Sequence, residues 1–338
     1  MPHWNKLDHN AGFSQEEQDY INNLPPLNES DADCVYRICS PMHPPSPLAR
    51  KTLTFCVTEL GYDQKSLHNP AQNLNEVTTG ENLIITPSRW ARDRLLDFGF
   101  DEGKIRVVRH GVNTETFTPL SEEERIGQRL ALGLTPSNIV FLNVGVPTWN
   151  KGIDLLIRAF ANVFRRNPEI RLVLKDARGL YGFPVDTVLQ TVGAQNPGLI
   201  TPEVLSAIRV IPNNLSQAEL RSLYGFVDYY VSPYRAEGFN LPVLEAQSCA
   251  TPVIVTSGGA TDDFCHGDGT RKIPSTFIRG NLGKTHGCAW NEPDYPALES
   301  ILTAAAQTPP SPEQRQSARN NALKHTWDSA VADLYPFI

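Results

Sequence analysis

The 338-residue sequence lacks several features that would assign its class at once. No apolar run reaches the roughly 18 residues that a membrane-spanning helix needs, and the first twenty residues hold neither a basic start nor an apolar run. The six cysteines include no C-x-x-C pair, which predicts reduced, mostly buried thiols rather than a disulfide framework or a zinc site. These absences favour a cytoplasmic protein.

Positive charge is also scarce, because the net charge is −7 at pH 7. Proteins that bind nucleic acid need a basic face, so this balance argues against a nucleic-acid partner. Arginines do gather in one stretch, at positions 158, 165, 166 and 171. We favour plain solvation of a helix face for them, with a peripheral membrane contact as the alternative. The length and the 40% apolar content fit two globular domains joined by a hinge.

The most informative segment places two carboxylates, Glu237 and Glu245, around a loop that leads into a helix. A short strand at 228–232 precedes it, another at 252–256 follows, and Pro242 favours a helix start. In such a unit the first helical turn and the helix dipole attract a diphosphate beyond the end of the strand. The pattern predicts a nucleotide-sugar site, and the alternative from spacing alone is a capped helix with one solvated Glu.

A second unit of the same kind lies earlier in the chain. It consists of a strand at 139–144, a loop at 145–152, an apolar stripe typical of a helix packed on a sheet, and a strand at 171–175. Lys151 stands where the helix begins, and an ammonium group there can neutralise a leaving diphosphate. A solvated loop lysine is the alternative.

The string EGFNLPVLEAQSCATPVIVTSGG resembles the E-x7-E signature of retaining glycosyltransferases of the family-4 type, and the loop ending in Lys151-Gly152 resembles their phosphate loop. The resemblance implies that Glu237 holds the donor sugar, that Glu245 binds the ribose and that Lys151 steadies the diphosphate. It also assigns donor binding to Gly145, Gly238, Phe239, Asn240 and Leu241, and to Asn213 in the segment 211–224 that passes the base.

One position departs from that family's pattern. Val146 stands where the family usually has a phosphate-binding arginine, so another cation must substitute or the donor is held more weakly. Lys175 and Arg178, at the end of the next strand, are the candidates for substitution. The pair Asp262-Asp263 follows a Gly-Gly turn within the donor-domain match, which argues against a metal site there, and we expect no metal and no cofactor besides the donor substrate.

The first third of the chain predicts strands at 33–39, 51–57 and 81–86, a helix at 88–98 and a strand from 104 that runs into the turn before Asn113. That turn, with Phe117 after it, resembles the crossing between the two domains of family-4 enzymes. An opening strand and glycine-rich loop are missing, because residues 1–30 are polar.

Several side chains of this part are candidates for the acceptor side. The resemblance makes His43, on a proline-rich loop, a candidate catalytic residue near the transferring sugar. Glu59 is a weaker candidate, for which an exposed carboxylate at a strand end is the favoured interpretation. His110 and Asn113 at the crossing are candidates for the floor of the cleft.

These features together predict an α/β protein of the GT-B type, with two facing doubly wound Rossmann-like domains of which the first is abbreviated. We expect an extension at 1–30, an acceptor domain at 31–117, a donor domain at 118–310 and a C-terminal helix at 311–338 packed toward the first domain. The expected reaction is retaining transfer of a sugar from a nucleoside diphosphate sugar to a carbohydrate, lipid-linked or small-molecule hydroxyl. The alternatives are an epimerase or hydrolase, and a non-catalytic subunit; a partner subunit or second copy is a candidate to complete the first domain.

Overall fold

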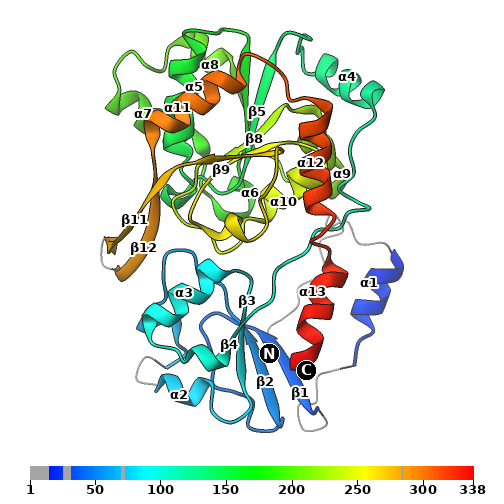
Figure 1. Cartoon of the computed structure of the whole chain (residues 1–338), viewed down its shortest axis with the longest axis vertical. Coiled ribbons are helices and arrows are strands. Elements are labelled where there is room, and N and C mark those ends of the chain that lie inside the picture. The colour runs from blue at the N-terminus through cyan, green and yellow to red at the C-terminus, as the bar shows by residue number, and fades with distance from the viewer. Residues whose placement is uncertain (1–14, 26–31, 70–72, 283–284) are drawn as a thin grey trace.

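The computed structural model describes residues 15–25, 32–69, 73–282 and 285–338. Two α/β regions, each built on a parallel sheet, lie one above the other in Figure 1. Most of the predicted extension at 1–30 lies outside the described residues, which include helix α1 (Gln15–Asn22) from that part. Among the described residues no helix is long and apolar enough to cross a membrane.

The first region contains a sheet of four parallel strands in the order β1-β2-β3-β4. Their bounds are β1 Cys34–Ile38, β2 Lys51–Phe55, β3 Leu83–Thr86 and β4 Ile105–Val107, which confirms the predicted strands. The described strands follow chain order without a reversal. One face carries a core that includes Met42, Ile84 and Leu95.

Helix α3 (Arg89–Phe98) is the main helix of the first region, and it is the one predicted. The Ser88 hydroxyl accepts a hydrogen bond from the amide of Ala91 and so caps the start. Gly99 ends the helix with a φ of 112°. The shorter elements are η2 Gln64–Ser66, α2 Leu74–Val77 and η3 Glu102–Lys104.

The second region contains a parallel sheet of six strands in the order β10-β9-β8-β5-β6-β7. Their bounds are β5 Ile139–Val144, β6 Ile170–Lys175, β7 Ile208–Ile211, β8 Tyr229–Ser232, β9 Val253–Thr256 and β10 Thr270–Ile273. The chain builds outward from β5 to β7 and then returns to place β8 beside β5. Ligands of doubly wound sheets bind where the strand order reverses, at the carboxyl ends of β5 and β8.

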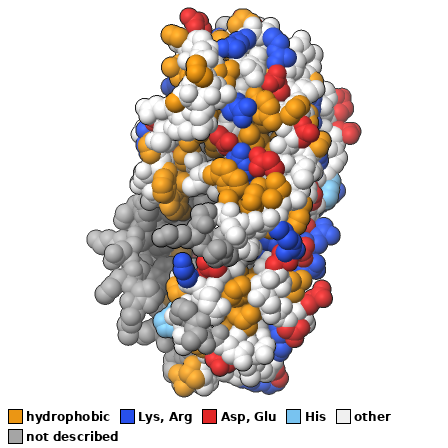
Figure 2. All heavy atoms as spheres, turned by 90° about the vertical axis from the view of Figure 1, so that its left-hand side faces the viewer, with side chains coloured by type: hydrophobic (Ala, Val, Ile, Leu, Met, Phe, Trp, Pro, Cys, Tyr) orange, Lys and Arg blue, Asp and Glu red, His pale blue; other side chains and the backbone are white. Residues whose placement is uncertain are grey.

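Helices cover both faces of this sheet, because apolar residues of β5 alternate between two cores. Ile139 and Phe141 belong to one core, and Val140 and Leu142 to the other. The helical elements are α4 Glu122–Ala131, η4 Trp149–Lys151, α5 Ile153–Phe164, α6 Arg178–Tyr181, α7 Val185–Gln195, α8 Pro202–Ser206, α9 Gln217–Phe226, α10 Leu241–Ser248, η5 Ala260–Asp263, α11 Tyr295–Ala305 and α12 Pro312–Ala322. Figure 2 shows basic and acidic side chains dispersed among apolar ones on the described part of one face.

An antiparallel hairpin that the sequence analysis did not predict, β11 (Ser275–Leu282) and β12 (Thr285–Pro293), extends from the second region toward α3 (Figure 1). The Ala289 amide donates to the carbonyl of Leu60 at 2.7 Å. Phe277 packs edge-on against Trp90 with ring centroids 6.0 Å apart. The hairpin therefore ties the second region to the first.

The chain crosses between the regions a second time near its end. After α12, the amide of Val112 donates to the carbonyl of His325 at 3.0 Å, so the two crossings lie side by side. Helix α13 (Trp327–Leu334) and η6 (Tyr335–Phe337) follow, and Leu334 and Phe337 pack against the first sheet. Of the predicted C-terminal helix at 311–338, α13 is thus found with the first region, whereas α12 packs on α10 of the second region, and the exact domain boundaries stay a prediction.

Candidate active site

Two loops at the reversal point of the second sheet form the centre of the candidate site. One follows β5 and carries Lys151, and the other follows β8 and carries Glu237. The loops touch at Gly152, where a Cβ atom would stand 1.9 Å from the carbonyl oxygen of Pro233 and where φ is 69°. Only glycine fits there without movement of the backbone. This contact brings Lys151 to the loop that bears Glu237.

The Lys151 ammonium group is held between two carboxylates from different regions of the molecule. Its Nζ atom donates to Oε2 of Glu237 at 2.7 Å and to Oε1 of Glu59 at 2.7 Å. Asn150 Nδ2 donates to the other oxygen of Glu59, also at 2.7 Å. Glu59 belongs to the first region, and its side chain is 41% exposed, as the favoured interpretation of an exposed strand-end carboxylate expects, but it is paired with Lys151 and Asn150.

Burial and the neighbouring charges set the protonation of Glu237 and Lys151. Burial raises the pKa of Glu237 to about 7, and the negative charge of Glu59 adds to the rise, although Lys151 opposes it. Burial lowers the pKa of Lys151, but the two carboxylates outweigh it, so this pKa lies above its ordinary value and the ammonium form persists at neutral pH.

A cavity of about 310 Å³ opens beside this triad, lined by residues of both regions. His110 lines it, as predicted, and burial lowers the pKa of its imidazole to about 4, which keeps the ring neutral at pH 7. The ring packs edge-on against Phe239, with centroids 5.2 Å apart. Asn113, in contrast, is exposed and accepts bonds from the amides of its own turn, so the prediction that it lines the cleft is wrong.

Most of the predicted donor-binding residues line this cavity: Gly145, Lys151, Glu237, Gly238, Phe239, Asn240 and Leu241. Asn240 adopts a left-handed conformation with φ 78°, and its Nδ2 donates to the Ser232 hydroxyl at 3.0 Å. That turn directs the chain into α10. The sequence pattern therefore located the loop and the helix start correctly.

Glu245 lies farther along α10 and is not among the residues that line the cavity. Its Oε2 accepts a bond from the buried hydroxyl of Tyr224 at 2.8 Å. Burial raises the pKa of Glu245, and the Tyr224 bond partly opposes the rise. The two predicted carboxylates therefore lie on the same loop and helix but in different surroundings.

Two other predicted site residues are also absent from the cavity lining. The ring of His43 stacks on His68, with centroids 4.0 Å apart. Asn213 is exposed, on the turn after β7. The structure brings neither of them to Lys151, because the loops that carry them follow other strands.

Val146 does line the cavity, and neither cation proposed to replace the missing arginine joins it there. Lys175 donates to the carbonyl of Asp176 at 2.5 Å, and Arg178 Nε donates to the Asp176 carboxylate at 2.8 Å. Of the residues that line the cavity, Lys151 is the one lysine or arginine. The Asp pair is engaged as well, since Asp263 binds Arg89 across the domain boundary at 2.6 Å and Asp262 binds Lys272 at 2.5 Å.

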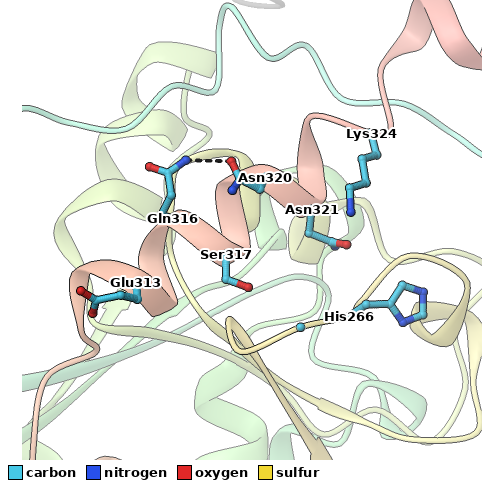
Figure 3. Close-up of a pocket in the computed structure, with 8 residues that line it drawn as sticks. His266, Glu313, Gln316, Ser317, Asn320, Asn321 and Lys324 are labelled. Atoms are coloured by element: carbon cyan, nitrogen blue, oxygen red, sulfur yellow. Dashed lines mark hydrogen bonds between the residues drawn. The ribbon is translucent and has the colours of Figure 1, made fainter.

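A larger hollow of about 400 Å³ lies elsewhere, between α12 and the loop before β10 (Figure 3). Half of its lining residues have amide or hydroxyl side chains, and Gln316 is bonded to Asn320 across one turn of α12 at 2.8 Å. It lies away from the ends of β5 and β8, so size alone does not identify the site. The smaller cavity contains the charged triad at the reversal point, and we take it as the candidate active site.

Residues 127–270, which include Lys151, Glu237 and Glu245, match the family described as glycosyl transferases group 1. This part of the chain therefore resembles a group 1 glycosyltransferase domain. The chain is 28% identical over 255 residues to the D-inositol 3-phosphate glycosyltransferase of Jonesia denitrificans, covering 75% of this chain and 55% of the relative. It is 32% identical over 190 residues to that of Kineococcus radiotolerans, covering 54% and 41%. The chain spans about half the length of these curated relatives.

Solved structures resemble the chain over both regions. A glycosyltransferase from Rickettsia africae matches with a TM-score of 0.64 and 16% identity, covering 90% of this chain and 76% of the other. Alr3699/HepE of Anabaena, crystallised with UDP and glucose, matches with a TM-score of 0.62 and 16% identity, covering 85% and 70%. This likeness confirms the GT-B fold and, at this identity, carries the fold alone.

The sequence did not predict two groups of residues at this site. Asn150 and Arg235 orient the loops: the carbonyl of Asn150 accepts from the amide of Arg235 at 2.7 Å, and the Arg235 guanidinium binds Asp154 at 2.8 and 2.9 Å. Ser88 Oγ donates to the carbonyl of Gly238 at 2.6 Å and so joins α3 to the predicted sugar-binding loop. The Asn-Lys-Gly order after β5 was the available signal for Asn150, and the sequence held none for the contact with Ser88.

Proposed function

We propose that this protein transfers a sugar from a nucleoside diphosphate sugar to an acceptor hydroxyl with retention of configuration. The observation that carries the proposal is the triad of Lys151, Glu237 and Glu59 at the reversal point of the sheet, in the part of the chain that matches group 1 glycosyltransferases. An ammonium group held there is placed to meet charge that develops on a leaving diphosphate. The UDP bound by Alr3699/HepE supports UDP as the first nucleotide to test.

In the proposed reaction, Glu237 holds hydroxyls of the donor sugar while the bond between the anomeric carbon and the diphosphate breaks. The acceptor oxygen attacks from the same face, and its proton passes to the departing diphosphate. Lys151 compensates the negative charge of that diphosphate, so we propose that no metal ion is needed. Glu245 would bind the ribose, with its carboxylate oriented by the Tyr224 hydroxyl.

A transfer assay with the purified full chain tests this proposal. Release of nucleoside diphosphate from UDP-glucose and other nucleotide sugars is measured with D-inositol 3-phosphate, named for the relatives, and with simple glycosides as acceptors. Replacing Lys151 by Met, or Glu237 by Gln, should lower kcat/KM by about 10²–10³-fold. Lys65→Met, a change at an exposed lysine of the first region, is the matched control and should leave the rate unchanged. Full turnover in both site variants would refute the assignment.

Val146 favours a second candidate function, a subunit that binds a nucleotide sugar without transferring it, because the cavity lacks a second lining cation. Thermal shifts with UDP, GDP, ADP and TDP, with Glu245→Ala as the control, separate the two. Saturation at 100 times the dissociation constant adds about 2.7 kcal/mol to the free energy of unfolding. Binding that is lost in Glu245→Ala, combined with no transfer to any acceptor, would support the subunit.

A further inference from the structure

Glu59 of the first domain lines the cavity, and the backbone at this residue is fixed by contacts with other elements. The Trp90 indole donates to the carbonyl of Glu59 at 2.6 Å, and the hairpin amide of Ala289 donates to the next carbonyl, that of Leu60, at 2.7 Å. Both contacts hold the main chain and leave the side chain to reach Lys151 and Asn150. The backbone at Glu59 and Leu60 is thereby held by two separate elements, α3 and β12.

The charges that line the cavity do not favour a diphosphate in this arrangement. The lining residues include two carboxyl groups, Glu59 and Glu237, against the single ammonium of Lys151. With a pKa of about 7, Glu237 is partly ionised at pH 7, and His110 is neutral. Lys151 already binds both carboxylates at 2.7 Å. An entering diphosphate would meet a site whose cation is saturated, and like charges at this range repel strongly in a poorly solvated cavity.

Of the two carboxylates that contact Lys151, the one of Glu59 is able to move away. The Glu237 side chain is 9% exposed, whereas that of Glu59 is 41% exposed. Glu59 is therefore already in contact with solvent, and its carboxylate is hydrated further when it turns away from Lys151. Glu237 has no such exit.

We propose that Glu59 is an internal counter-ion for Lys151. The diphosphate of the donor displaces the Glu59 carboxylate from Lys151 on binding, and Glu59 pairs with Lys151 again when the nucleoside diphosphate leaves. The proposal rests on the proposed function for its ligand. Glu59 acts as a positioning residue: it keeps the ammonium group extended toward the cavity in the empty protein, and it competes with the product for the same cation. No bond is made or broken in the exchange.

Calorimetric titration of the full chain with UDP, inorganic pyrophosphate and uridine tests the exchange. Replacing Glu59 by Gln removes the competing charge and retains a hydrogen-bond acceptor, so UDP and pyrophosphate should bind roughly tenfold tighter, a typical coupling between sites. Uridine has no phosphate, and its affinity should not change. In the transfer assay the variant should show a lower KM for the donor together with a lower kcat, because product is released more slowly.

Arg279→Gln is the matched control, since it removes another ion pair across the domain boundary, with Asp97 at 2.8 Å, without touching Lys151. A tenfold gain in Glu59→Gln but not in Arg279→Gln supports the exchange. Equal gains in both variants would mean that a looser interface causes the effect, and unchanged or absent binding in Glu59→Gln would overturn the proposal. If pyrophosphate binds tighter as expected but no sugar is transferred, the exchange stands and the proposed function falls.

Discussion

At the scale of the residue, the carboxyl group of Glu237 couples protonation to stability. Its pKa is about 7 in the folded protein, against an ordinary value of 4.5, so the folded state binds the proton more tightly than the unfolded chain does. The stabilisation from this group is complete below pH 4.5 and is lost as the pH rises through about 7. The folded protein is thus less stable when Glu237 is ionised.

Replacing Glu237 by Gln should remove this pH dependence. Between pH 5 and pH 8, the wild-type free energy of unfolding should fall relative to that of the variant by roughly 1–3 kcal/mol. Urea denaturation at several pH values measures the difference. Glu115→Gln, at an exposed carboxylate, should follow the wild-type profile. Parallel profiles for wild type and Glu237→Gln would show that burial does not govern this group.

At the scale of the element, the start of α5 depends on a glycine that has no room for a side chain. A Cβ atom at Gly152 would meet the carbonyl oxygen of Pro233 at 1.9 Å, while Gly182, with a similar φ of 72°, has no neighbour within 4 Å. Both positions require a left-handed backbone, so the pair separates backbone strain from the close approach.

We expect Gly152→Ala to lower the free energy of unfolding by at least about 3 kcal/mol, and Gly182→Ala by about 1 kcal/mol. The first variant should also lose transfer activity, because Lys151 precedes the displaced residue. Chemical denaturation and the transfer assay provide the two measurements. Similar losses for the two variants would mean that the β5 and β8 loops are not held together at this contact.

Elements with strong local signals were predictable from the sequence. The run Ile139–Val144 is apolar except for Asn143, as expected of a strand buried on both faces, and the stripe that begins at Ile153 has the helical period. The hairpin β11–β12 was missed because its strands carry few buried apolar positions: β11 alternates half-buried with exposed residues. Its order comes from contacts with the first domain, such as Phe277 on Trp90, which no local pattern encodes.

At the scale of the whole molecule, closure of one domain on the other decides what the site contains. Glu237 and Lys151 could be predicted because each stands at a fixed place in a βα unit of one sheet. Glu59 lies 92 positions before Lys151 in the chain and reaches it across the cleft. This pairing depends on how the two domains pack together, which no local sequence pattern encodes. His43 follows another strand of the first domain, and the packing of that domain directs its ring onto His68 instead.

The same closure makes Gly238 a contact between domains. A Cβ atom there would stand 2.2 Å from Cγ2 of Val57, so Gly238→Ala should hold the first domain away from the predicted sugar-binding loop. Because displacements of about 1 Å can lower rates by 10²-fold, we expect kcat/KM to fall by about 10–10²-fold with little change in the stability of either domain.

Shortening the opposing side chain should reverse this effect. Val57 is half exposed, so Val57→Ala alone should alter stability and activity only slightly, whereas the double variant Gly238→Ala/Val57→Ala should regain most of the lost kcat/KM. A double-mutant cycle on kcat/KM measures the coupling between the two positions. Additive effects, with no recovery in the double variant, would show that the domains do not meet at this point during turnover, and that the closed arrangement of Glu59, Lys151 and Glu237 belongs to the resting protein alone.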